Sequence, residues 1–287
     1  MTLRIDQALH WARAEIEPCS DSARLDAELL LAHCVDKPRS YLYGHPEALL
    51  DIACWQLFQK LVALRLKPTP IAYLLGTREF YSRSFYTGPQ ALVPRPETEL
   101  LVDLALQQLP PQQAMKICDL GTGTGIIAIT LKKERPMAEV YATDVDAACL
   151  ELARQNASQH AVAIEWIKSD WYRGLPSALK FDLIASNPPY IAAEHPFLAQ
   201  GDLPAEPSLA LTPGNTGLEA LQKIIAGAHQ HLVNGGYLLL EHGYDQQAAV
   251  AELLHANAFM DIRCEFDLND LPRVSIAKRV ENRVSAA

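Results

Sequence analysis

From Met115 onwards, apolar segments alternate with amphipathic helical segments, and this alternation limits the possible folds more than any other feature of the chain. Alternating strands and helices predict an α/β domain wound around a largely parallel sheet, because parallel strands are joined by crossover connections. Only a short link separates the last two expected strands, so one of them should be antiparallel. The seven expected strands are Lys116–Leu120, Val140–Asp144, Ile164–Ser169, Phe181–Ser186, Tyr237–Glu241, Ile262–Phe266 and Val274–Lys278.

Two regions precede this α/β domain. Residues 1–75 carry apolar residues at helical spacing between proline-containing breaks, which predicts a small domain of several short helices. Residues 76–96 are rich in aromatic and β-prone residues and predict a β-hairpin or an extended linker, and Gly88-Pro89 predicts a turn in this region. A helix should then begin within Pro94–Glu99 and continue to Gln108. The expected domains are therefore residues 1–75, the linker 76–96, and residues 97–287.

Charge and cysteine content bear on partners and location. Twenty-five Lys and Arg side chains against 34 Asp and Glu give a net charge of −9, which argues against a long nucleic-acid contact, since basic surfaces supply most non-specific affinity. No apolar stretch approaches the roughly 20 residues of a membrane span, and the first residues lack a signal-peptide layout. Six scattered cysteines without a Cys-x-x-Cys pair favour reduced thiols. We therefore expect a cytoplasmic protein.

A glycine-rich loop follows the first strand of the α/β domain. The segment Asp119–Gly125 (Asp-Leu-Gly-Thr-Gly-Thr-Gly) leads directly into an expected helix over Ile126–Lys133. Glycines let the backbone turn sharply and approach a ligand, and helix N-terminal amides can bind it. The spacing G-x-G-x-G is neither the dinucleotide motif G-x-G-x-x-G/A nor a P-loop. A generic strand–helix turn is the alternative.

Acidic residues end the next two strands. Asp144 can accept hydrogen bonds from both hydroxyls of a ribose, although it or Asp146 can equally cap the following helix. At the end of the third strand, Asp170 and Trp171 can receive the edge and face of an adenine, unless Trp171 is simply packed. The glycine loop and these residues, at successive strand ends, together predict an adenosine pocket.

The segment Asn187-Pro188-Pro189-Tyr190 lies at the carboxyl end of the fourth strand, the edge at which open α/β sheets bind ligands. The Asn187 side-chain oxygen and the Pro188 carbonyl can both accept hydrogen bonds from one NH₂ group, and Tyr190 can stack on its conjugated plane. This arrangement suits methylation of an amide or aromatic amine, where positioning and electrostatics carry the catalysis. A rigid loop with an Asx turn is the alternative.

These motifs resemble the class I methyltransferases that use S-adenosylmethionine. The segment Val93–Glu99 (Val-Pro-Arg-Pro-Glu-Thr-Glu), the helical N-terminal region and the later Gly235–Gly243 resemble the PrmC (HemK) family of release factor glutamine methyltransferases over nearly the whole chain. The resemblance implies a Rossmann-like, seven-stranded methyltransferase domain. It also implies methyl transfer to the amide nitrogen (N5) of the glutamine in the Gly-Gly-Gln motif of class 1 peptide chain release factors, which modulates translation termination.

The resemblance also implies a set of site residues. The S-adenosylmethionine site would comprise Gly121, Thr122, Gly123, Thr124, Gly125, Asp144, Asp170, Trp171 and Asn187. The catalytic residues would be Asn187, Pro188 and Tyr190, and the acceptor would also meet Pro189, Arg95 and Glu97. The product would be S-adenosylhomocysteine, and no metal, stable nucleic acid or membrane partner is expected. A monomer is expected, with residues 1–75 recognising the protein substrate.

Several other readings stay open. An amino-methyltransferase acting on adenine or guanine in RNA or DNA fits the Asn187–Tyr190 segment equally well, because both acceptors are planar NH₂ groups; a non-catalytic adenosine-binding protein and a nicotinamide dehydrogenase are further alternatives. His229 and His231 are two residues apart on an expected helix and cannot share a metal. The loop Asp267–Val274 lacks the glycine usual in the family, which leaves its local conformation open.

Overall fold

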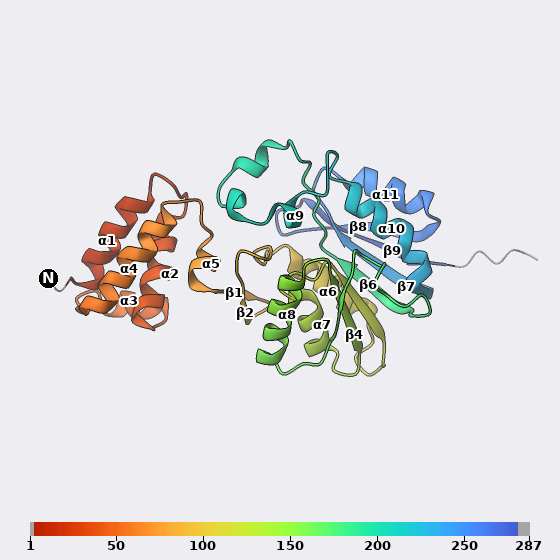
Figure 1. The fold of residues 1–287 in the computed structure, drawn as a ribbon, viewed down its shortest axis with the longest axis horizontal. Coiled ribbons are helices and arrows are strands. Elements are labelled where there is room, and N and C mark those ends of the chain that lie inside the picture. The colour runs from red at the N-terminus through yellow and green to blue at the C-terminus, as the bar shows by residue number, and fades with distance from the viewer. Residues whose placement is uncertain (1–2, 281–287) are drawn as a thin grey trace, which may run out of the picture.

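The computed structural model describes residues 3–280. A bundle of helices lies at one end, the seven-stranded sheet with its covering helices lies at the other, and a two-stranded hairpin lies between them (Figure 1). The described helices of the bundle are α1 (Ile5–Ile16), α2 (Ala23–Val35), α3 (Arg39–Gly44), α4 (Ile52–Arg65) and α5 (Ile71–Leu75).

The helical bundle has a small core of its own. The rings of Trp11 and Trp55 meet edge to face at 4.9 Å, and both lie against the fully buried ring of Phe58. Asp51 accepts a hydrogen bond from the amide of Cys54 at 2.7 Å and caps α4. The several short helices expected for residues 1–75 are therefore present, each ending at a proline- or glycine-containing break or a turn.

The hairpin pairs β1 (Thr77–Phe80) with β2 (Arg83–Tyr86). The turn expected at Gly88-Pro89 is present after β2, where the amide of Ala91 donates to the carbonyl of Gly88 at 3.1 Å. The hairpin's own turn, which the composition does not mark, lies at Tyr81 and Ser82, with φ of 52° and 56°. A two-residue turn with both φ positive matches the twist of paired strands. The register closes where the amide of Thr87 donates to the carbonyl of Gly76 at 3.0 Å.

The sheet has the strand order β5-β4-β3-β6-β7-β9-β8. β3 to β7 are parallel, and β9 is antiparallel to both β7 and β8, as the short link between the last two strands predicts. β7 and β8 begin earlier than expected, at Leu232 and Phe259. The strands are β3 (Lys116–Leu120), β4 (Glu139–Asp144), β5 (Glu165–Lys168), β6 (Phe181–Ser186), β7 (Leu232–Glu241), β8 (Phe259–Phe266) and β9 (Pro272–Arg279).

Helices cover both faces of the sheet (Figure 1). One face packs against α6 (Thr98–Gln108), α7 (Ile126–Glu134) and α8 (Ala147–Gln159), and the other against α10 (Glu219–His231) and α11 (Gln247–Ala256). Neighbouring residues of one strand serve opposite cores: Leu239 packs with the first set and Leu238 with the second. This is the double-sided burial of a parallel sheet, and it leaves the carboxyl edge of the strands for a site.

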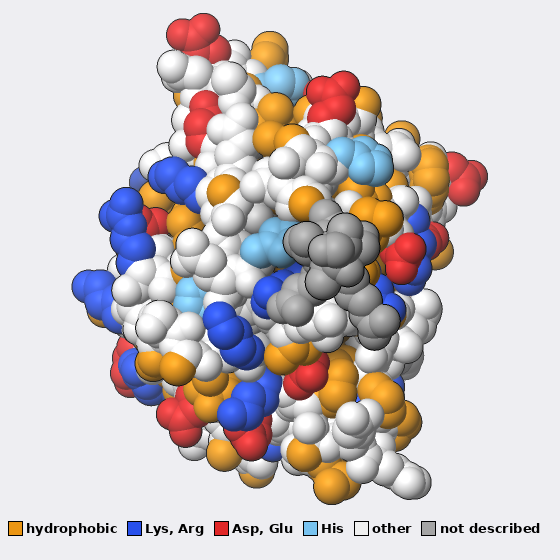
Figure 2. Space-filling view, turned by 90° about the vertical axis from the view of Figure 1, so that its right-hand side faces the viewer, with side chains coloured by type: hydrophobic (Ala, Val, Ile, Leu, Met, Phe, Trp, Pro, Cys, Tyr) orange, Lys and Arg blue, Asp and Glu red, His pale blue; other side chains and the backbone are white. Residues whose placement is uncertain are grey.

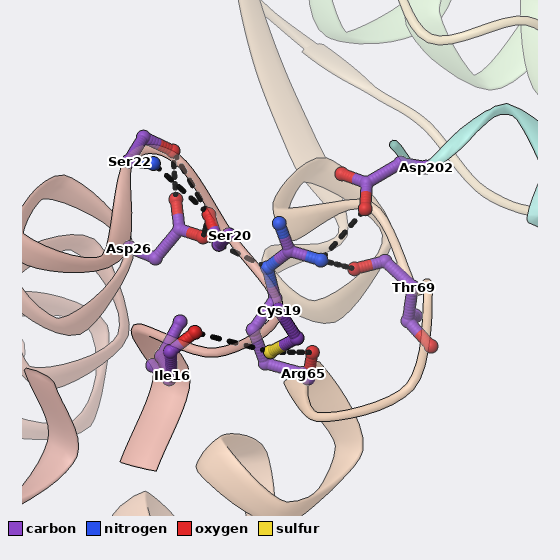
Figure 3. A network of polar contacts seen from close by, with 8 residues as sticks. All are labelled: Ile16, Cys19, Ser20, Ser22, Asp26, Arg65, Thr69 and Asp202. Carbon is purple, nitrogen blue, oxygen red and sulfur yellow. Dashed lines mark hydrogen bonds and ion pairs between the residues drawn. The ribbon is translucent and has the colours of Figure 1, made fainter. Parts of the chain in front are cut away.

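The segment that follows β6 extends towards the helical bundle (Figure 1). It contains the short helices η1 (Pro196–Ala199), η2 (Leu203–Ala205) and α9 (Ser208–Leu211). Arg65 at the end of α4 donates to Asp26 at 2.9 Å and to Asp202 of this segment at 2.6 Å, and so joins the two regions (Figure 3). The side chain of Arg65 is only 6% exposed.

The end of the molecule opposite the helical bundle carries basic, acidic and apolar side chains side by side (Figure 2). Acidic side chains lie among the basic ones on this face, so it offers no continuous basic surface. Within residues 3–280, no helix is both long and apolar enough to cross a membrane.

Candidate active site

The glycine loop between β3 and α7 is held by backbone hydrogen bonds. The amides of Gly121 and Thr122 both donate to the carbonyl of Thr143, each at 2.9 Å. Gly125 has a φ of +84°, and a Cβ there would lie 3.0 Å from Ile129 and 3.1 Å from Ala153. A residue with a side chain would therefore be strained in its backbone and crowded by α7 and α8.

Asp119, the buried carboxylate of β3, holds the glycine loop through hydrogen bonds on the side away from the cavity. Its Oδ2 accepts from the Thr122 hydroxyl at 2.6 Å and from the amide of Ala128 at 3.3 Å. Burial raises the pKa of Asp119 to about 7, against the hydrogen bonds from Thr122 and Ala128, which lower it. The side chain is fully buried, so it braces the loop and does not line the cavity.

Asp144 ends β4 beside the loop. One carboxylate oxygen accepts from the amide of Gly123 and the other from the amide of Asp146, each at 2.9 Å. Burial raises the pKa of Asp144, and these two hydrogen bonds oppose the shift. Asp146 caps α8 by accepting a hydrogen bond from the amide of Ala148 at 2.8 Å. Asp144 is therefore not the helix cap, and its carboxylate lines the cavity.

Trp171 and Asp170 follow β5 on the same edge of the sheet. The indole of Trp171 lies against the glycine loop, since a Cβ on Gly121 would be 3.4 Å from its Cζ3. The Trp171 backbone has a φ of 53° and its carbonyl accepts from the Ser169 hydroxyl at 2.7 Å. Asp170 also lines the cavity and forms an ion pair with Arg173 at 3.0 Å.

Asn187 follows β6, the neighbour of β3. Its Nδ2 donates to the Thr98 hydroxyl at 3.0 Å. One residue earlier, the Ser186 hydroxyl donates to the carbonyl of Leu120 at 2.6 Å and ties the ends of β6 and β3 together. The Asn187 side chain and the glycine loop therefore lie in one cavity because their strands are adjacent.

This cavity has a volume of about 280 Å³. Most of the sequence-predicted site residues line it, and those that do are Arg95, Gly121, Thr122, Gly123, Thr124, Asp144, Asp170, Trp171, Asn187 and Pro189. Glu97, Gly125, Pro188 and Tyr190 are not among the lining residues. The Tyr190 hydroxyl instead donates to Glu241 at 3.3 Å, so the stacking of this ring on an acceptor stays a prediction.

Two stretches line the cavity that sequence reasoning missed. Residues 90–92 follow the hairpin, and residues 207–213 surround α9. Glu206 connects the two stretches beside the cavity. Its buried carboxylate accepts a hydrogen bond from the amide of Val93 at 2.9 Å and forms an ion pair with Arg95. No local pattern marks either stretch, because the contact joins residues 111 positions apart.

The described residues, 3–280, hold no group of three or more His, Cys, Asp or Glu side chains arranged as metal ligands. The chemistry of the cavity is that of hydrogen-bond acceptors, backbone amides and aromatic or apolar walls. Such a lining can hold a nucleoside and orient an NH₂ group.

Two family models match the chain. One, described as the PrmC N-terminal domain, matches residues 7–76, and the other, the methyltransferase small domain, matches residues 98–201. Curated relatives named release factor glutamine methyltransferase match most of the chain. That from Xylella fastidiosa (strain Temecula1) is 44% identical over 89% of this chain and 93% of its own length, that from Burkholderia pseudomallei 43% over 91% and 94%, and that from Coxiella burnetii 40% over 96% and 99%.

Solved structures share the fold at low identity. The hMettl16 catalytic domain in complex with the MAT2A 3'UTR hairpin 6 has a TM-score of 0.59 and 17% identity, over 76% of this chain and 84% of that one. A methyltransferase from Pyrococcus furiosus has a TM-score of 0.54 and 20% identity, over 70% and 91%. These likenesses establish the class I methyltransferase fold that the family resemblance implies.

Proposed function

The chain belongs to the family of release factor glutamine methyltransferases, and we propose that it methylates the glutamine side chain of the Gly-Gly-Gln motif in class 1 peptide chain release factors. It is an S-adenosylmethionine-dependent methyltransferase. The observation that carries the proposal is the placement of the Asn187 side chain and the glycine loop in one cavity, after the adjacent strands β6 and β3.

The cofactor half of the cavity suits S-adenosylmethionine, which when bound supplies an electrophilic methyl group. The Asp144 carboxylate has acceptor capacity beyond its two backbone hydrogen bonds and would take the ribose hydroxyls. Trp171 and Asp170 would meet the adenine, and Gly121–Gly125 would approach the remainder of the molecule without side-chain interference. No residue of the chain is assigned a metal in this proposal.

On the acceptor half, Asn187 Oδ1 and the Pro188 carbonyl would accept the two hydrogens of the glutamine NH₂ group. An amide nitrogen is a poor nucleophile because its lone pair is delocalised into the carbonyl. Two acceptors fixed in space favour the pyramidal geometry that aligns the lone pair with the methyl carbon. The nitrogen becomes acidic only after methylation, so the proton can leave to solvent without a strong base.

The helical residues 1–75 would recognise the release factor, and the hairpin 76–96 would connect them to the catalytic residues 97–287. The surface exposes apolar side chains on this bundle, including Leu49, Ile52 and Leu57. We propose that the enzyme acts as a monomer in the cytoplasm.

Methylation of an exocyclic base amine is the alternative function, because the hMettl16 structure contains an RNA hairpin. That likeness, at 17% identity, concerns the fold alone. The net charge of −9 and the match of residues 7–76 to the PrmC N-terminal domain favour the protein substrate.

To test the proposal, the purified protein and labelled S-adenosylmethionine are incubated with a class 1 release factor in one reaction and with ribosomal RNA or DNA in another. Mass spectrometry of the digested products locates the methyl group. We expect label on the Gly-Gly-Gln glutamine only, and its loss in Asn187→Ala with S-adenosylhomocysteine binding retained. Label confined to nucleic acid would overturn the proposal.

A further inference from the structure

We propose that Gln246 is a positioning residue whose side-chain amide fixes the Asn187–Tyr190 segment by holding the carbonyl of Tyr190. This inference rests on the proposed function, since it assigns the residue that keeps the two acceptor oxygens of that segment in place. Gln246 is not among the residues that line the cavity, so it would act through the segment and not by touching the cofactor or the acceptor.

The Gln246 side chain makes three hydrogen bonds to the backbone of three different loops. Its Nε2 donates to the carbonyl of Tyr190 at 2.9 Å and to that of Gly217 at 3.3 Å. Its Oε1 accepts from the amide of Gly243 at 2.9 Å. Both hydrogens and the oxygen of the amide are therefore used. A flipped amide would set its oxygen against two carbonyl oxygens, so only one orientation of the amide satisfies these groups.

Gln246 occupies the N-cap position of α11, where a side chain commonly accepts a hydrogen bond from the first amides of the helix. The Gln246 side chain makes no such bond. It is turned instead to the segment after β6, 56 positions earlier in the chain. Capping of α11 is therefore not the role of this side chain.

Gly217 brings a second loop against the same carbonyl group. It has a φ of +78°, and a Cβ there would lie 2.5 Å from the carbonyl oxygen of Tyr190, so a side chain could not be added without moving this oxygen. The next residue is also held, because the amide of Ile191 donates to the carbonyl of Leu211 at 3.0 Å. The Tyr190 carbonyl is thus enclosed by a glycine and by the NH₂ group of Gln246.

Two prolines make a stiff connection between Tyr190 and Asn187. Proline fixes φ at about −65°, so Pro188 and Pro189 leave few free rotations between the two ends of the segment. The Asn187 end is held where its Nδ2 donates to the Thr98 hydroxyl at 3.0 Å. With the Tyr190 end held as well, the Pro188 carbonyl and Asn187 Oδ1 keep a constant spacing, and these are the two oxygens proposed to accept the hydrogens of the glutamine NH₂ group.

Gln246→Glu removes the donated hydrogen bonds and keeps the rest of the side chain. The carboxylate can still accept from the Gly243 amide, and its charge at the N-terminus of α11 favours the helix, but it cannot donate to Tyr190 or Gly217. We expect kcat to fall by roughly 10- to 100-fold, because small displacements of positioned groups have effects of this size. The Kd for S-adenosylhomocysteine, measured by calorimetry, should not change.

Asn257→Asp is the matched control at the other end of α11. Asn257 is the C-cap residue, its Nδ2 donates to the carbonyl of Leu253 at 2.8 Å, and it is not among the lining residues of the cavity. Loss of a donating NH₂ group at this position should leave kcat as in the wild type. Equal losses of kcat in the two variants, or weaker cofactor binding in Gln246→Glu, would show a general structural role and overturn the proposal.

Gly217→Ala tests the same carbonyl without changing Gln246. The added Cβ displaces the Tyr190 carbonyl, so kcat should fall while cofactor binding is kept. Gly235→Ala is its control, because Gly235 has a φ of +84° and, among residues 3–280, a Cβ there would approach only Lys278, at 4.0 Å. Both changes strain the backbone. A similar loss of kcat in both would be the result of strain alone and would contradict the proposal.

A measurement without substrate separates this proposal from the function itself. In ¹⁵N-labelled protein, the amide hydrogen of Ile191 should exchange with solvent faster in Gln246→Glu than in the wild type. The amide of Gly121, which donates to the carbonyl of Thr143 at 2.9 Å, should keep its rate. Equal exchange of Ile191 in both proteins overturns the positioning role. If the wild type methylates no release factor, the proposed function fails whatever the exchange shows, and full activity of Gln246→Glu beside an active wild type overturns the positioning role alone.

Discussion

The two halves of the cavity are built in different ways. On the cofactor half, backbone amides of the glycine loop donate to the carbonyl of Thr143 and to the carboxylate of Asp144, about 20 positions away. On the acceptor half, side chains make the connections: Asn187 meets Thr98 across 89 positions and Arg95 meets Glu206 across 111. Arg65 and Asp202, 137 positions apart, connect the segment after β6 to the helical bundle. The first half is therefore largely a property of the consecutive elements β3, α7 and β4, whereas the second depends on the whole chain being folded.

The largest effect should come from breaking the connection between the acceptor half and the helical bundle. Arg65→Met leaves Asp26 and Asp202 facing each other without a cation, and removal of one partner from a buried ion pair costs about 3–5 kcal/mol. Chemical denaturation should show this loss, and the KM for the release factor should rise while cofactor affinity is kept. Arg39→Met, which removes the half-exposed partner of Glu28, is the control and should cost about 1 kcal/mol or less. Equal losses in the two variants would contradict the prediction.

A substitution in the cofactor half should weaken cofactor binding and leave the KM for the release factor unchanged, the reverse of the result expected for Arg65→Met. Asp144→Ala removes the carboxylate expected to hold the ribose, and we expect the Kd for S-adenosylhomocysteine to rise by about 10- to 100-fold, since charged hydrogen bonds contribute about 1.5–3 kcal/mol. Calorimetry measures the Kd, and the KM for the release factor should not change. Asp182→Asn alters a carboxylate that binds the amide of Lys116, outside the cavity, and should leave the Kd as it is. An unchanged Kd in Asp144→Ala together with a raised Kd in Asp182→Asn would show that Asp144 does not bind the ribose.

The third prediction concerns the pH dependence of stability that comes from Asp119, the buried residue beneath the glycine loop. Burial raises the pKa of Asp119 to about 7 in the folded protein, above its ordinary value of about 3.9. The protonated carboxyl is therefore favoured by folding, and this contribution to stability is complete below pH 4 and disappears as the pH rises through 7.

In Asp119→Asn this contribution to the pH dependence should vanish, so that the unfolding free energies of variant and wild type move relative to each other by about 2–3 kcal/mol between pH 5 and pH 8. Urea titrations at several pH values measure the difference. Part of the slope should persist in the variant, because burial also raises the pKa of Glu241 to about 7. A constant difference between the two proteins across this range would show that Asp119 is ionised throughout.

The smallest effect on stability should come from a substitution in the hairpin turn, which is outside both halves of the cavity. Ser82 in the hairpin turn has a φ of 56°, a conformation that glycine adopts without strain. Ser82→Gly should raise the unfolding free energy by about 0.5 kcal/mol, the strain relieved being partly offset by the greater freedom of glycine in the unfolded chain. Neither kcat nor the Kd for S-adenosylhomocysteine should move. A loss of stability would indicate that the Ser82 side chain is needed in the turn.

The same contrast explains what could be predicted from the sequence. The seven strands, the antiparallel end of the sheet and the clustering of the glycine loop with Asp144 and Trp171 follow from local periodicity and from the rule that parallel strands end at one edge. The turn at Gly88-Pro89 could be predicted because glycine and proline are typical turn residues. The hairpin's own turn at Tyr81 and Ser82 could not, because two residues other than glycine adopt a positive φ there. The partners of Arg65, Arg95 and Asn187 could not be predicted, since an ion pair or hydrogen bond across about 100 residues leaves no periodic pattern.

The hydrogen bond from Ser186 to the carbonyl of Leu120 has a consequence for how such enzymes can diverge. It lies immediately before both functional loops and, with the ladder that pairs Ile117 with Leu183 and Asp119 with Ala185, sets the two loops one strand spacing apart, about 4.8 Å. The sheet therefore fixes the spacing between the proposed sites of the methyl donor and the acceptor. Because Asn187 follows this hydrogen bond directly, a change in the segment beyond Tyr190 or in the helical bundle can present another acceptor without realigning the proposed site of the methyl donor.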